Sequence, residues 1–404
     1  MVYQSEFKKV SSDIVRSDFN YVDISEVGAS FLRGEKWANC SKTKKVAFRP
    51  GLPPLDIFPI LKWKKLSNQY WQFIRSSELT YDFDSGVQVL RDTLVSYLRL
   101  NRNIKCDASQ VFVVGGSVQS LYLISNILLN PGDAVGVEEP TFPNVISIIK
   151  GMRANLVCSQ EVSNTEKQET KNCKFIHVSP NCQYPIGKRM TISQRLDLCE
   201  RANKMGSFII ENDYEHEINN RRESIPTIFD LDQQGRTIYL GTFNRVLHPS
   251  IRIGYMIVPK VLIEPMSALL SSSHRFVSPT IQHKLNSFID RKHFQKHIRN
   301  VLVVSEDRNK MFVQLFEKYL SFCMTILYAS SASLHMCAKF NRKMNDVKIC
   351  EILEVNGISI HPLSQCYSQK EKQYGLIMGY ACVEKSKMEK VFIKIQSTFR
   401  EVGL

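Results

Sequence analysis

Short apolar runs alternate with longer amphipathic stretches between about residues 86 and 243. The runs VFVVGG, AVGVEEP, NLVC, KFIHVSP, SFIIEND and TIYLGTF are bounded by polar or turn residues, which is typical of buried strands. A helical pattern at 87–101 precedes the first run, and further helical patterns, from Ser117 onward and around 145–150, separate later ones. Apolar strands that alternate with helices favour a largely parallel α/β sheet.

A second pattern begins after about residue 290. A long amphipathic helix, with Ile298, Val301 and Leu302 on one face, leads into the strand-like segments SASLHMCAKFN, GISIHPL and YGLIMGYACV. The helical segment MEKVFIKIQSTFREV closes the chain. These segments predict a smaller α+β domain.

The length of 404 residues exceeds the size at which one hydrophobic core stops growing, so about two domains are expected. We predict a large domain at 48–290 and a small domain at 291–404. Residues 1–47 are polar and lack a core pattern, which indicates an arm or linker. RPGLPPLDIFP, residues 49–59, is too rich in proline for a helix, and 159–172 is predicted to be a surface loop.

Composition narrows the classes of protein. No apolar run reaches about 18 residues, so no membrane span is expected. The N-terminus lacks the charged, apolar and small-residue zones of a signal peptide, which predicts a cytoplasmic protein. The eleven cysteines form no CxxC pair and no Cys/His cluster at zinc spacing, so we expect reduced thiols and no metal site.

The net charge of +14 is compatible with nucleic-acid binding or with a surface that attracts anions. The basic residues are dispersed, with the densest runs at 42–45 and 291–299. Because no DNA-reading motif accompanies them, nucleic acid remains an open alternative to a solvated basic face.

Three predicted strand ends carry residues suited to a ligand. Gly115, Gly116 and Ser117 stand between a strand and a helix, where backbone amides can bind an anion. IIENDYEHE places a polar cluster after another strand, and GTFNRVLHPSIRIGY offers Thr242 and Arg252 for a phosphate. Each signal is weak alone, since such residues also serve turns and helix caps.

Together these segments resemble the fold type I pyridoxal-phosphate-dependent aminotransferases of class I and II. They are most similar to the aminotransferase-like domain of MocR-type (GntR family) transcriptional regulators. The resemblance runs from about Val46 to the C-terminus through seven motifs: FRPGLPPLDIFP, YxxxxG at 81–86, NPGDAVGVEEPTFP, SPNCQYPIG, IIENDYE, GTFNRVLHPSIRIGY and HPLSQCY. It implies the aspartate aminotransferase fold, with a large mostly parallel sheet domain and a smaller α+β domain. ISEVGASFLRGEKW is similar to the linker that precedes that domain in the regulators, and their winged-helix DNA reader is expected to be missing.

The resemblance implies a homodimer that binds pyridoxal 5′-phosphate or pyridoxamine 5′-phosphate. The phosphate contacts it implies are Gly116, Ser117, Val118, Thr242, Arg252 and, from the partner subunit, Tyr81.

The ring contacts follow from the same resemblance. Phe142 would stack on the ring where the family usually has tyrosine. Gln183 and Tyr184 would lie near the ring hydroxyl, and Tyr214 would approach it from another side.

Two positions depart from the family. Its Schiff-base lysine falls on Arg245, preceded by Asn244 where serine is usual. A guanidinium is effectively never a free nucleophile, so neither the covalent link nor the lysine's proton transfer can occur. The acidic partner of the pyridine nitrogen falls on Asn212, which cannot keep that nitrogen protonated. A slip of one residue in the alignment would let Asp213 serve instead.

Both departures make the pocket more cationic, which predicts an anionic ligand. His248 is the nearby ionisable group able to replace a base, although it also suits a loop residue that packs against Pro249. The family's substrate-carboxylate arginine has no clear counterpart, since MGYACVEKSK offers only lysines.

Three functions therefore stay open. The first is a pseudoenzyme that binds the cofactor or a related small anion noncovalently. The second is a lysine-independent enzyme that uses His248 or Tyr214 for proton transfer. The third is a cofactor-free sensor or scaffold derived from a regulator.

Overall fold

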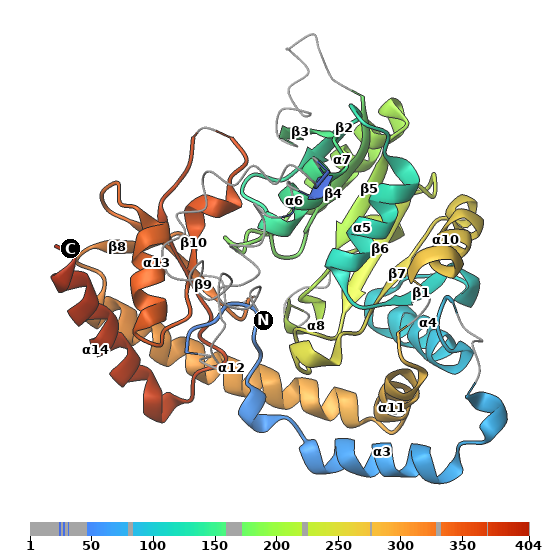
Figure 1. The fold of residues 1–404 in the computed structure, drawn as a ribbon, viewed down its shortest axis with the longest axis horizontal. Coiled ribbons are helices and arrows are strands. Elements are labelled where there is room, and N and C mark those ends of the chain that lie inside the picture. The colour runs from blue at the N-terminus through green and yellow to red at the C-terminus, as the bar shows by residue number, and fades with distance from the viewer. Residues whose placement is uncertain are drawn as a thin grey trace, which may run out of the picture.

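The computed structural model describes residues 47–79, 84–158, 172–219, 225–274, 277–328, 333–369 and 371–403, with a few residues between 24 and 31. Tyr81, nearly all of the arm predicted at 1–47 and nearly all of the loop predicted at 159–172 lie outside the described residues. The described chain forms two lobes, each built on its own sheet (Figure 1).

The larger sheet has seven strands in the order β1-β7-β6-β5-β4-β2-β3. Neighbours pair in parallel except β7, which runs antiparallel to both β1 and β6. The six strands predicted from apolar runs are confirmed, and β7 is an addition. The bounds are β1 (Val111–Val114), β2 (Ala134–Val137), β3 (Asn155–Cys158), β4 (Cys173–Val178), β5 (Phe208–Asn212), β6 (Thr237–Thr242) and β7 (Gly254–Ile257).

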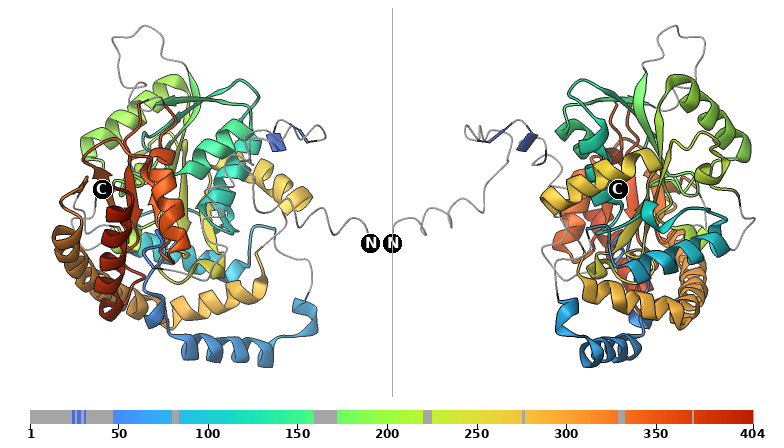
Figure 2. Two further views of the ribbon diagram at one scale, coloured as in Figure 1. Left: turned by 60° about the vertical axis from the view of Figure 1, so that its left-hand side comes forward. Right: turned by 90° about the vertical axis from the view of Figure 1, so that its right-hand side faces the viewer.

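Helices cover both faces of this sheet, because strands such as β1, β6 and β7 are buried along their whole length (Figures 1 and 2). α5, α6 and α10 enclose one apolar core with β1 and β2. α4 packs against β1 from the other face, and α7 and α9 cover β4 and β5. The bounds are α4 (Gln88–Arg102), α5 (Ser117–Leu128), α6 (Pro143–Gly151), α7 (Ile192–Met205), α8 (His216–Asn219), α9 (Ile228–Leu231) and α10 (Ile263–Leu269).

The smaller sheet is antiparallel, in the order β10-β11-β9-β8. The long helix α12 runs from the large lobe to this sheet and packs there against α14 (Figure 1). The bounds are α12 (His293–Tyr319), β8 (Met324–Ile326), β9 (Met336–Phe340), α13 (Asp346–Val355), β10 (His361–Pro362), β11 (Gly375–Met378) and α14 (Lys385–Glu401).

The segment that begins at Ala47 is anchored in the small lobe. Ala47 forms a parallel bridge with Ile358, and the carbonyl of Phe48 accepts a hydrogen bond from Gly379 N at 2.7 Å. The Phe48 ring packs edge-on against Phe312 and Phe392 at 5.5 and 5.2 Å. This anchor fixes the position of the next four residues, which reach the space between the lobes.

Helix α3 (Ile60–Phe73) was not predicted from the pattern. It packs on α11 (Pro279–Asp290) and lies on the outside of the molecule in every view (Figures 1 and 2). Trp63, Leu66 and Tyr70 form the face that packs on α11, whereas Ile60, Leu61, Trp71 and Phe73 are exposed. No helix among the described residues is long and apolar enough to cross a membrane.

Candidate functional site

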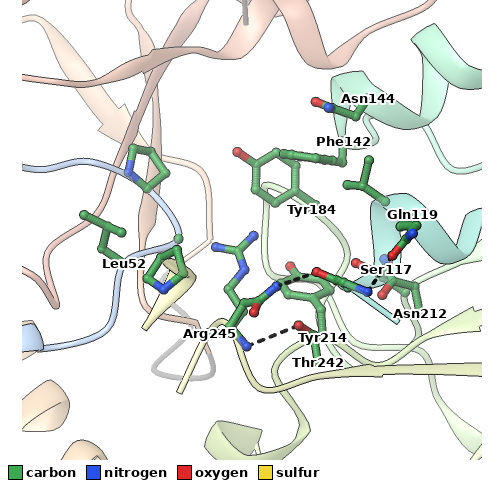
Figure 3. Close-up of a pocket in the computed structure, with 18 of the residues that line it drawn as sticks. Leu52, Ser117, Gln119, Phe142, Asn144, Tyr184, Asn212, Tyr214, Thr242 and Arg245 are labelled. Atoms are coloured by element: carbon green, nitrogen blue, oxygen red, sulfur yellow. Dashed lines mark hydrogen bonds between the residues drawn. The ribbon is translucent and has the colours of Figure 1, made fainter. Parts of the chain in front are cut away.

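A pocket of about 480 Å³ lies at the carboxyl ends of β1, β4, β5 and β6 and extends to the small lobe (Figure 3). Open α/β sheets bind ligands at this edge, because helix N-termini and strand-end loops converge there. The segment Arg49–Leu52 closes one side of the pocket. His361, at the start of β10, is the small lobe's contribution among the described lining residues.

The start of α5 forms one end of the pocket. Gly116 caps this helix with φ 128°, a conformation that strongly favours glycine. A Cβ on Gly116 would lie 2.8 Å from Asn244 Nδ2, so the space also requires glycine. The first amides of a helix have no intrahelical partner. Those of Ser117 and Val118 therefore provide donors for an anion in the pocket.

Asn244 ties the loops around this helix start together. Its Nδ2 donates to Gly115 O at 3.2 Å, and its Oδ1 accepts from Ile253 N at 3.1 Å. Its own backbone N–H donates to Thr242 Oγ1 at 3.2 Å. The asparagine thus links the ends of β1 and β6 to the start of β7. It helps to shape the phosphate cradle, the anion-binding end of the pocket at the start of α5, Thr242 and Arg252.

Two predicted phosphate side chains also line this end. Thr242 is buried as the last residue of β6. Arg252 ends the short 3-10 helix Pro249–Ile251 in a left-handed conformation, with φ 48°, and its side chain is exposed at the pocket. The five predicted phosphate contacts within the described chain, Gly116, Ser117, Val118, Thr242 and Arg252, therefore border the same pocket.

Phe142 and Tyr184 form an aromatic wall of the pocket. Their rings meet edge to face, with centroids 5.0 Å apart and planes at 87°. The structure places Gln183 elsewhere, which corrects its predicted position near a ring hydroxyl. Its Nε2 donates to Pro140 O at 3.1 Å and its backbone N–H donates to Lys188 O, and the residue is not among those that line the pocket.

The end of β5 presents Asn212, and not Asp213, to the pocket. Asn212 is half-buried, and its Oδ1 has no hydrogen-bond partner in the described part of the chain. Asp213 is buried behind the strand, where it accepts from Arg102 Nη2 and Tyr239 Oη, both at 2.7 Å. Burial acts to raise the pKa of Asp213, but the charge of Arg102, together with His216 and the hydrogen bonds from Asn181 and Tyr239, lowers it below its ordinary value. The structure therefore favours Asn212 over Asp213 as the residue that faces the pocket.

Arg245 points into the pocket from the loop after β6 (Figure 3). Its guanidinium lies over the ring of Tyr214, with Cζ 5.1 Å from the ring centroid. A Cβ on Gly51 would collide with Arg245 Nη1, so the guanidinium packs directly on that backbone. The Tyr214 hydroxyl donates to Cys182 O at 2.9 Å, and only the face of its ring supports the arginine.

His248 lies outside the pocket, which corrects its prediction as a replacement base. Its ring packs edge-on against Phe58 at 4.7 Å, and Nδ1 is 2.8 Å from Ser250 Oγ. Burial and the nearby Lys284 lower its pKa. His248 therefore packs against Phe58, which agrees with the alternative prediction of a packing role.

The lining residues that were not predicted from the sequence include three with basic side chains: Arg49, His177 and His361. His177 is buried in β4 and its Nδ1 has no hydrogen-bond partner in the described structure. Burial lowers the pKa of His177 to about 4, and burial with the charges of Arg49 and Arg245 lowers that of His361 to about 3. Both imidazoles are therefore neutral at neutral pH.

The described lining residues include three arginines and no aspartate or glutamate. None of the three guanidiniums, on Arg49, Arg245 and Arg252, forms an ion pair with a carboxylate in the described chain. Arg49 and Arg245 are partly buried, and partly buried cations are costly unless an anion meets them. The electrostatics of the pocket thus favour a negatively charged ligand.

The fold and the pocket define an aminotransferase-like protein. Residues 55–326 match the model of the aminotransferase class I and II family, and the chain belongs to that family. Membership implies pyridoxal phosphate or pyridoxamine phosphate as the cofactor of the family.

The chain is also related to MocR-type regulators. It is 29% identical over 358 residues to the probable rhizopine catabolism regulatory protein MocR of Rhizobium meliloti, which covers 88% of this chain and 72% of that protein. Two solved structures share its fold. The kynurenine aminotransferase of Pyrococcus horikoshii, in complex with PMP, matches with a TM-score of 0.81 and 20% identity, over 97% of this chain and 99% of that one. The α-aminoadipate aminotransferase LysN of Thermus thermophilus, complexed with N-(5′-phosphopyridoxyl)-L-leucine, matches with a TM-score of 0.79 and 15% identity, over 94% of this chain and 99% of that one.

Proposed function

We propose that this protein is a pseudoenzyme of the aminotransferase family that binds pyridoxal phosphate, pyridoxamine phosphate or a related phosphate-bearing anion noncovalently. The observation that carries the proposal is Arg245. By the resemblance it takes the position of the family's Schiff-base lysine, and its guanidinium points into the pocket beside the phosphate cradle.

The residues fit the phosphate of such a cofactor. The amides at the start of α5, the hydroxyl of Thr242 and the guanidinium of Arg252 would hold it, and Gly116 leaves the space it needs. When bound, the cofactor carries amino groups and withdraws electrons from its substrate. Asn212 would meet the ring nitrogen with an uncharged amide, which cannot hold a proton on that nitrogen as a carboxylate does.

The same residues do not fit covalent attachment or the usual proton transfer. A guanidinium stays charged and does not attack a carbonyl. The two groups proposed for a lysine-independent enzyme are not placed for it, because His248 lies outside the pocket and the Tyr214 hydroxyl is bonded to Cys182 O. These positions favour a binding function over transamination.

A sensor is the form of binding protein that the relatives support, since several of them are named as transcriptional regulators. We further propose that the protein is a homodimer. Helix α3 carries apolar side chains that the described chain does not cover, among them Leu61, Trp71 and Phe73.

Calorimetric titration with pyridoxamine phosphate tests the proposed function, because this form has no aldehyde and can bind only noncovalently. We expect saturable binding that Arg252→Gln weakens by about tenfold or more, the effect of losing one charge-assisted hydrogen bond. Arg299→Gln, on the exposed face of α12, removes the same charge away from the pocket and should leave the affinity unchanged. If neither pyridoxal phosphate nor pyridoxamine phosphate binds, the proposal is contradicted.

A further inference from the structure

The two ends of the pocket carry separate positive charges. The cradle end holds the start of α5, Thr242 and Arg252. Arg245 points away from that end, into the space beside Leu52 and across the pocket from Ser117 (Figure 3). The pocket therefore offers cationic contacts at two positions. The buried carboxyl of Glu215 also acts electrostatically on Arg245, but burial raises the pKa of Glu215 and the residue does not line the pocket. A single phosphate at the cradle would therefore leave the Arg245 side of the pocket without an anion of the ligand.

Arg49 joins Arg245 at this second position. Its backbone follows Phe48, which the small lobe holds in place, and the next residues bring Gly51 against the Arg245 guanidinium. Both arginines act electrostatically on the same group, the buried imidazole of His361. Two guanidiniums thus converge on the side of the pocket that faces the small lobe.

The small lobe does not supply this charge itself. β11 presents four buried residues, Gly375–Met378, and none of them is ionisable. The lysines that follow lie on the surface, where Lys385 pairs with Asp307 at 2.8 Å and Lys387 pairs with Glu384. The second cationic position is therefore built by the segment at Arg49 and by the loop after β6.

We propose that Arg245 and Arg49 form a second anion subsite, and that the ligand is a phosphate ester that also bears a carboxylate. This inference rests on the proposed function, since the phosphate of the same ligand occupies the cradle. A guanidinium stacked on Tyr214 keeps its edge N–H groups for a carboxylate, whose geometry they match. A conjugate of a phosphopyridoxyl group with an amino acid has both anions, and a pocket of about 480 Å³ is in the size range of small-molecule sites.

Two conjugates that differ only in the carboxylate test the inference. N-(5′-phosphopyridoxyl)-L-leucine carries it, and N-(5′-phosphopyridoxyl)-3-methylbutylamine has the same phosphate, ring and side chain without it. By calorimetry the wild-type protein should bind the leucine conjugate about tenfold to hundredfold more tightly, as expected of a desolvated charge-assisted contact.

Variants show which residues cause the tighter binding of the leucine conjugate. In Arg245→Gln and in Arg49→Gln the ratio of the two affinities should fall toward one, whereas Arg299→Gln should keep it. Arg245→Lys should retain part of the ratio because it keeps the charge, and neither conjugate has an aldehyde with which the new lysine could react. This variant also keeps the test informative if Arg245→Gln does not fold.

The outcomes separate the two proposals. Equal affinities of the two conjugates in wild type, or a ratio that survives both glutamine variants, overturns the second subsite while leaving noncovalent phosphate binding intact. Failure of pyridoxamine phosphate and of both conjugates to bind overturns the proposed function and the subsite together.

Discussion

Arg245 is the residue on which the proposed function depends. The resemblance aligns it with the family's Schiff-base lysine, and its guanidinium lies over the Tyr214 ring in the pocket. We propose that the pocket therefore has an anion contact in place of a covalent attachment point. The sequence was sufficient to locate this residue, together with Asn212, because both stand inside long motifs. The sequence could not show whether Asn212 or Asp213 faces the pocket. The buried ion pair of Asp213 with Arg102 answers this, because it holds Asp213 away from the pocket.

His177 and Arg49 were beyond sequence reasoning for different physical reasons. His177 interrupts an apolar run without changing its strand pattern, and only the position of β4 under the pocket shows its exposure to a ligand. Arg49 lies in a proline-rich segment, whose path depends on the packing of Phe48 in a lobe more than 200 residues away in sequence.

His177 should make folding sensitive to acid. Its pKa of about 4 in the folded protein lies below the ordinary value of 6.5, so the unfolded chain binds the proton first as pH falls. The stability that neutral His177 contributes is present above pH 6.5 and is lost as pH drops toward 4. The free energy of unfolding of wild type minus that of His177→Gln should fall by up to about 3 kcal/mol over this window. Denaturant titrations at several pH values measure it, and a flat difference contradicts the assignment.

At the scale of elements, strands and helices with an inner apolar face were predictable, whereas α3 and β7 were not. α3 has apolar side chains on its exposed surface, such as Leu61, Trp71 and Phe73, as well as on the face that packs against α11. β7 is four residues long and begins just after the turn at Arg252. Its first residues belong to the motif GTFNRVLHPSIRIGY, so it was not recognised as a separate strand. Its antiparallel direction depends on pairing with β1 and β6, which no local pattern reports.

The turn from β1 into α5 gives an element-scale prediction. Gly116→Ala would force an alanine to φ 128° and place its Cβ 2.8 Å from Asn244 Nδ2. We expect a loss of about 1–3 kcal/mol in stability and at least a tenfold loss of pyridoxamine phosphate affinity. Gly132→Ala is the matched control, since φ is 91° there and nothing lies within 4 Å of the added Cβ. It should lose stability and keep the affinity. Wild-type affinity in Gly116→Ala would rule out the cradle.

On the scale of the whole molecule, the pocket depends on both lobes. The large sheet supplies the cradle, and the small lobe holds Phe48 so that Arg49 and Gly51 reach Arg245. The resemblance was sufficient to predict two domains around one site. It could not show that the second cationic position is assembled by a segment anchored in the opposite lobe.

The exposed face of α3 predicts self-association. Leu61 is 82% exposed and Phe73 80% exposed, which is unfavourable for side chains of their size unless a partner covers them. Leu61→Glu with Phe73→Glu should convert a dimer into a monomer in analytical ultracentrifugation. Val355→Glu, on α13 and 82% exposed, adds the same charge in the other lobe and should leave the dimer intact. A wild-type monomer at micromolar concentration would contradict the homodimer.

The most direct test of noncovalent binding is a titration with pyridoxal phosphate followed by visible absorbance, on wild type and on Arg245→Lys with Asn212→Asp. Borohydride treatment and intact-mass measurement then show whether a covalent adduct has formed. We expect wild type to bind the cofactor without a Schiff-base band or an adduct, and the double variant to gain both. An adduct on wild type would show that another amine performs the lysine's role, and it would contradict the account.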